Sequence, residues 1–70
     1  METLYFSSSL IPEILELPIN NKEKIISTLH WAIAENLNST IVKLDDLRGG
    51  VELKISSYDY SELYNCFKRT

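Results

Sequence analysis

The first residues alternate between apolar and polar side chains and predict a short strand over residues 2–7. Leu4 and Phe6 are separated by one residue, and Thr3 and Tyr5 occupy the alternate positions. Side chains two residues apart on a strand share a face, so this spacing is typical of a strand that lies with one face against a core.

Two amphipathic helices are predicted next. The first follows a pair of serines suited to an N-cap and has Pro12 in its first turn, where the missing N–H costs nothing. Pro18 ends this helix, because the residue before a proline is pushed out of the α region. The second helix begins near Asn20, which forms a capping-box pattern with Glu23, and ends near residues 36–38. Its predicted core stripe consists of Ile25, Ile26, Leu29, Ile33 and Leu37.

Residues 40–44 and 51–56 predict two strands that pair as a hairpin, joined by a turn containing Gly49 and Gly50. The segment 59–68 is open to two interpretations. An apolar stripe with helical spacing favours a helix, whereas a strand would place an acid among aromatic residues on one face. The whole pattern predicts one α+β domain over residues 1–70, with an N-terminal strand, two helices, a hairpin, a C-terminal helix or strand, and an antiparallel sheet.

The length limits how much of the chain can be buried. A chain of 70 residues buries only about 60% of its unfolded surface, so we expect a thin core. The single cysteine, Cys66, cannot form an internal disulfide, and a reducing cytoplasm is the expected location. A homodimer is one way to enlarge such a core. No apolar run is long enough to span a membrane, so no membrane association is expected.

Charge and candidate chemistry point away from an enzyme. The net charge is −3 and the seven Lys and Arg residues are scattered, so direct nucleic-acid binding is not expected. His30 is the only histidine and lies at the edge of the predicted core stripe, and no cysteine-nucleophile motif surrounds Cys66. The adjacent pair Asp45 and Asp46 is a weak basis for a metal site. We therefore expect no catalytic residue, metal or cofactor.

Trp31 is the most informative side chain, because the helical wheel places it about 170° from the centre of the predicted core stripe. Two interpretations are open. Either another element, such as the C-terminal segment, covers the indole, or the indole is an exposed anchor, since Trp and Tyr dominate binding hot spots. Under the second interpretation, aromatic anchors and carboxylates together bind a protein partner with a basic surface. The residues expected to do so are Trp31, Tyr60, Tyr64, Glu35, Asp45, Asp46 and Glu62.

Two stretches, LYFSSSLIPEILELPINNKEKIISTLHWAIAENL and IVKLDDLRGGVELKISSYDYSELYNCF, resemble the RelE/ParE/HigB toxin superfamily. The resemblance implies a strand, two helices joined at Leu-Pro and an antiparallel sheet, and it implies cleavage of ribosome-bound mRNA. Lys54 and Ser61 stand where the family often has arginine, and the chain ends at Thr70 where family members continue into another strand. A relative with these departures is expected not to cleave RNA.

The expected function is therefore that of a small acidic, non-enzymatic binding protein. A chain rich in Asn, Ile and Lys is typical of inhibitors or regulators that phages and mobile elements encode against a host factor. Such a protein would block a basic or nucleic-acid-binding surface of that factor. The alternative is a RelE/HigB-like toxin–antitoxin component that acts on mRNA.

Overall fold

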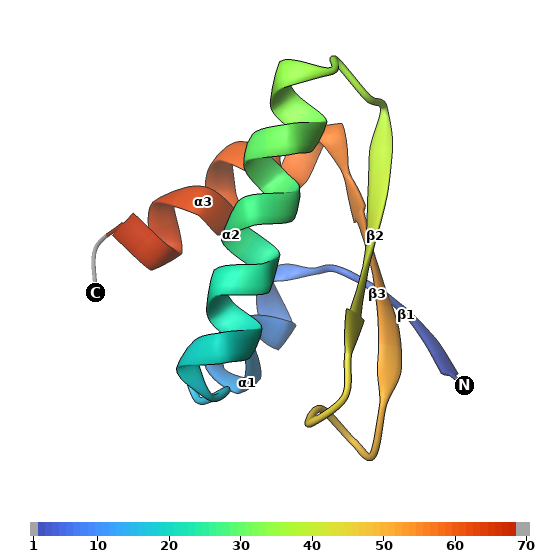
Figure 1. The fold of residues 1–70 in the computed structure, drawn as a ribbon, viewed down its shortest axis with the longest axis vertical. Helices are drawn as coiled ribbons and strands as arrows, with labels where there is room; N and C mark the ends of the chain where they lie inside the picture. Colours follow the sequence, from blue (N-terminus) through green and yellow to red (C-terminus); the bar gives the residue numbers. More distant parts are fainter. Residues whose placement is uncertain (1, 69–70) are drawn as a thin grey trace.

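One face of a three-stranded sheet is covered by helices and the other is left open (Figure 1). The computed structural model describes residues 2–68. Short 3-10 turns at Ser8–Leu10 and Ser57–Asp59 lead into α1 and α3. The elements in chain order are β1 (Glu2–Tyr5), α1 (Ile11–Leu15), α2 (Ile19–Ala34), β2 (Ser39–Leu44), β3 (Val51–Ser56) and α3 (Tyr60–Lys68). This is the α+β class that the sequence predicts, and the segment 59–68 is mainly helical.

The sheet has the strand order β1-β3-β2 and is mixed. The predicted hairpin is confirmed, because β2 pairs antiparallel with β3. The prediction of a wholly antiparallel sheet is wrong for β1, which pairs parallel to β3 with Leu4 opposite Leu53. The alternation of apolar and polar residues determines which side chains share a face of the sheet. Whether a strand pairs parallel or antiparallel depends instead on the path that the chain takes through the helices between the strands.

The core lies between the sheet and the helices. Alternate residues of β2 and β3 face the helices, as their period-two pattern predicts. On the helical side, residues from each of α1, α2 and α3 meet this surface. The side chains with no exposed area include Ile14, Ile25, Leu29, Leu44, Leu53, Ile55 and Leu63.

The core face of α2 is rotated relative to the predicted stripe. Ile25, Leu29 and Ala32 are buried, whereas Ile33 is 50% exposed. A stripe drawn from large apolar residues overlooks alanine, which is small enough to let a helix approach a sheet closely. Ala32 therefore takes the core position that the sequence pattern gave to Ile33.

The ends of α2 are set by backbone hydrogen bonds. The predicted capping box at Asn20 is wrong: Pro18 is the N-cap, and its carbonyl accepts hydrogen bonds from Asn21 N at 3.0 Å and Lys22 N at 3.2 Å. At the other end Asn36 adopts φ 61°. Leu37 N donates to Ala32 O at 3.0 Å and Asn36 N donates to Ile33 O at 3.1 Å. This pair of bonds is the Schellman motif.

Substitutions at Asn36 test this helix end. Asn36→Val should lower the free energy of unfolding by about 1–2 kcal/mol, because a β-branched residue is strained in the left-handed region. Asn36→Gly, the matched control, should leave stability unchanged or slightly raised, since glycine adopts positive φ freely. Urea unfolding followed by circular dichroism measures both, and equal stability of the two variants would contradict the account.

Candidate partner-binding surface

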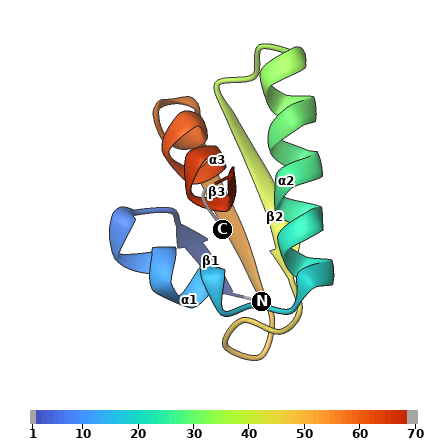
Figure 2. The same ribbon diagram turned by 90° about the vertical axis from the view of Figure 1, so that its left-hand side faces the viewer.

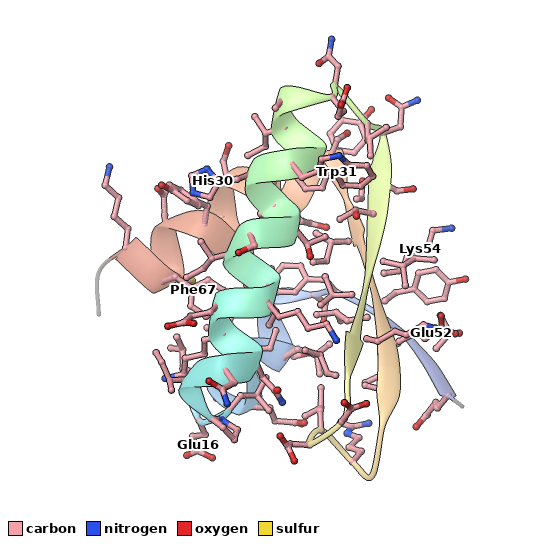
Figure 3. The ribbon with its side chains drawn as sticks, viewed as in Figure 1. Glu16, His30, Trp31, Glu52, Lys54 and Phe67 are labelled. Carbon is pink, nitrogen blue, oxygen red and sulfur yellow. The ribbon has the colours of Figure 1, made fainter. Side chains whose placement is uncertain are left out.

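Trp31 lies on the flank of α2 that faces away from α3. Its side chain extends from the helix toward β2 and remains 55% exposed (Figure 3). The helix α3 does not cover it, because α3 packs against the opposite flank of α2. There the rings of His30 and Tyr64 meet edge to face, with centroids 5.1 Å apart. The indole is thus partly packed and partly open to solvent.

The spacing of residues along α2 explains the character of this flank. Lys24, Thr28, Trp31 and Glu35 follow one another at intervals of three or four residues, so they share one side of the helix. Thr28 Oγ1 donates a hydrogen bond to Lys24 O at 2.8 Å, so the hydroxyl proton of Thr28 is bonded within the helix. Glu35, one turn beyond Trp31, is exposed. An aromatic side chain and a carboxylate therefore stand together here.

β2 lies beneath this flank and is an edge strand of the sheet. Ser57 N donates to Asn38 O at 2.8 Å, which makes Asn38 and Ser57 a hydrogen-bonded pair. Because such pairs alternate with non-bonded pairs in an antiparallel ladder, residues 40, 42 and 44 direct their backbone groups toward β3. The backbone N–H and C=O groups of Ser39, Ile41 and Lys43 therefore point outward from the sheet.

The free edge of β2 and the exposed flank of α2 form one surface, which we call the β2-edge surface. Figure 2 shows α2 on the outer side of β2, so that the helix overhangs this edge of the sheet. The Ile41 side chain lies on the open face of the sheet and is 51% exposed. The β2-edge surface is defined by Trp31, Glu35, Ser39, Ile41 and Lys43.

Tyr60 is a core residue rather than the exposed anchor that the sequence predicts. It is 5% exposed, and its hydroxyl donates to Leu37 O at 3.1 Å. Burial raises the pKa of Tyr60 above its usual value. Tyr64 is half-buried in its contact with His30. These two tyrosines belong to the α2–α3 contact, on the far side of α2 from Trp31.

The predicted carboxylates do not converge on Trp31, apart from Glu35. Asp45 and Asp46 follow the C-terminal end of β2, where Asp46 Oδ2 accepts a hydrogen bond from Asn21 Nδ2 at 3.1 Å. Glu62 lies on α3 and accepts hydrogen bonds from Ser8 Oγ at 3.0 and 3.1 Å. The structure thus distributes the residues of the predicted site over several elements. Sequence reasoning also missed Ser39, Ile41 and Lys43, because no local pattern shows which strand lies at the edge.

Other polar contacts in the described part of the chain are structural. Arg48 Nη2 and Glu13 Oε1 form an ion pair at 3.0 Å, and because both side chains are exposed, water screens the pair and it adds little to stability. On the open face of the sheet, Lys54 Nζ lies 5.7 Å from the centroid of the Tyr5 ring. Within residues 2–68, no group of three His, Cys, Asp or Glu residues is placed to hold a metal ion. No helix in that range has the length and apolarity needed to cross a membrane.

Comparison with known proteins identifies no relative: no protein family, curated protein or solved structure matches the chain.

Replacing Tyr60 tests its assignment to the core. Tyr60→Phe should lower the free energy of unfolding at pH 7 by about 0.5–1.5 kcal/mol, because the hydrogen bond to Leu37 O is lost. Tyr58→Phe is the control, since Tyr58 is 93% exposed and its hydroxyl faces water.

Above about pH 10 unfolded Tyr60 ionises while folded Tyr60 keeps its proton. Above this pH the free energy of unfolding of the wild type therefore falls, whereas that of Tyr60→Phe is not lowered by this ionisation. The difference in unfolding free energy between the two proteins narrows. Denaturant titrations at pH 7 and pH 10.5 measure both effects, and a Tyr60→Phe variant as stable as Tyr58→Phe at pH 7 would place Tyr60 outside the core.

Proposed function

We propose that this is a small, acidic, non-enzymatic binding protein that inhibits or regulates a cytoplasmic host factor, as proteins of phages and mobile elements do. It binds through the β2-edge surface and covers a basic or nucleic-acid-binding surface of that factor. The observation that carries the proposal is Trp31, which stands 55% exposed beside a free strand edge.

The position of Trp31 supports a binding role on energetic grounds. Burying a large aromatic side chain is among the largest single contributions that a residue makes to a protein interface. Here the fold leaves more than half of the indole in water, although α3 covers the other flank of the same helix. A partner that covers the indole would remove its exposed part from water, and this burial would stabilise the complex.

Charge supports a basic partner. The chain carries a net charge of −3. Glu35 stands beside Trp31, and Asp45 and Asp46 follow the other end of β2, so carboxylates lie near both ends of the free edge. Opposite charge on a partner speeds encounter and favours the correct orientation.

The exposed area of the chain is that of a folded monomer. Its exposed area is 4533 Å², and a folded monomer of this size exposes about 4500 Å². A homodimer, which the thin core suggested as a possibility, is therefore not part of our proposal. The β2-edge surface is available to a different partner.

Capture from a bacterial lysate with two matched variants tests the proposal. Trp31→Ala should weaken binding of the captured factor about 30-fold, the loss expected when a hot-spot aromatic is removed. Ile33→Ala should bind like the wild type, because Ile33 is similarly exposed on the other flank of α2. The wild type and Ile33→Ala should then displace nucleic acid from the factor, and Trp31→Ala should not. Capture that is indifferent to Trp31 would contradict the proposal.

The toxin-like alternative is tested with translating ribosomes. Residues 60–68 form α3 and not a strand, so this segment lends the toxin-like alternative no support. Under our proposal, purified protein leaves ribosome-bound mRNA intact. Reproducible cleavage that is lost on Lys54→Ala would favour the toxin instead.

A further inference from the structure

The outer edge of β2 carries backbone groups without a partner strand. The N–H and C=O groups of Ser39, Ile41 and Lys43 point away from β3. This follows because the hydrogen bond from Ser57 N to Asn38 O shows which alternate residues of β2 are bonded to β3. An exposed row of this kind is a template for pairing with another chain. β2 has 6 residues, against 4 in β1, and it alone lies beneath the exposed flank of α2.

We propose that an extended segment of the partner protein adds to β2 as a fourth strand, beneath Trp31. This inference rests on the proposed function and specifies how the partner binds. The added segment forms main-chain hydrogen bonds with Ser39, Ile41 and Lys43, and such bonds provide affinity without regard to side-chain identity. Its side chains on the helical side of the sheet meet the indole of Trp31, which makes an apolar residue the best fit there.

The position of α2 favours an extended segment over a second copy of this chain. Two copies paired symmetrically through β2 would place their edge strands about 4.8 Å apart. Packed helices need about 8–10 Å between their axes. Because α2 already overhangs the outer side of β2 (Figure 2), the two α2 helices would collide. A lone strand that brings no helix of its own fits under the overhang.

Charge sets the sequence type of the segment. Glu35 lies at the end of α2, close in the chain to the start of β2, and Asp45 and Asp46 follow the end of β2. Lys43, the basic residue of this edge, stands opposite Glu52 in the ladder, so its cross-strand neighbour is a carboxylate. The segment that fits best has β-branched residues at its centre and Lys or Arg at both ends.

Three synthetic peptides test strand addition by NMR titration of the isotope-labelled protein. The first is the blocked peptide Lys-Lys-Val-Thr-Val-Thr-Lys-Lys. The second has N-methyl groups on its four central residues, which removes the amide protons needed for pairing and keeps the side chains. The third replaces each Lys by Glu.

The first peptide should shift the amide resonances of Ser39, Ile41 and Lys43 and change the fluorescence of Trp31. Trp31→Ala should weaken this binding about tenfold, a difference of about 1.4 kcal/mol, and Ile33→Ala should not weaken it. The N-methylated and Glu-containing peptides should leave the three amides unmoved.

Other results would overturn the inference in different ways. If the first peptide leaves the three amides unmoved at millimolar concentration, or if the N-methylated peptide binds equally well, strand addition is wrong. Equal binding of the Glu-containing peptide would contradict the basic character of the segment. Shifts of these amides with protein concentration alone would show that a second copy occupies the edge.

The two proposals fail separately. A host factor captured through Trp31, together with no peptide pairing, leaves the proposed function standing and removes strand addition. Peptide pairing at β2, together with capture that is indifferent to Trp31, leaves strand addition standing and removes the proposed function.

Discussion

Burial of one apolar face of the sheet against the helices holds this fold together. β3 is the central strand, and its apolar residues Val51, Leu53 and Ile55 are 0–1% exposed. Each such side chain contributes about 1.5–3 kcal/mol when fully buried. The entropy lost when the chain is ordered opposes folding by about as much as the summed burial of the core favours it. A core as small as that of these 70 residues therefore depends on this contact. The positions of β1, α1, α2 and α3 follow from the need to cover that face.

The same constraint explains which surfaces stay open. With every helix of residues 2–68 on one side, the opposite face of the sheet and the outer edge of β2 remain in water (Figure 1). α2 lies far enough out over β2 that its outer flank has no neighbour, and Trp31 is on that flank. The exposed indole and the unpaired strand edge are thus two consequences of one packing arrangement. We place the proposed binding function where they coincide.

Much of the fold could be predicted from local pattern. Alternation located the hairpin strands, the spacing of Tyr60, Leu63, Tyr64 and Phe67 favoured a helix over a strand at α3, and the helical wheel placed Trp31 away from the core. Features that depend on tertiary packing could not be read in this way. The parallel pairing of β1 and the N-cap at Pro18 depend on the path of the chain between elements.

The candidate site was predicted only in part, for the same reason. The core position of Ala32 follows from the closeness of α2 to the sheet, and the burial of Tyr60 from the approach of α3 to the end of α2. An aromatic residue on a helical stripe has the same local pattern whether it anchors a partner or a core. An edge strand likewise has the same alternation as a central one, so the outward groups of β2 could be recognised only from the sheet order.

Hydrogen exchange of the backbone amides in the free, dilute protein tests the central claim most directly, because that claim requires β2 to have an unpaired outer edge. We predict alternation along this strand. The amides of Ser39, Ile41 and Lys43 should exchange nearly as fast as unstructured ones, and those of Thr40, Val42 and Leu44 should be strongly protected. Uniform protection from Ser39 to Leu44 would show that the edge is already paired and would contradict the account.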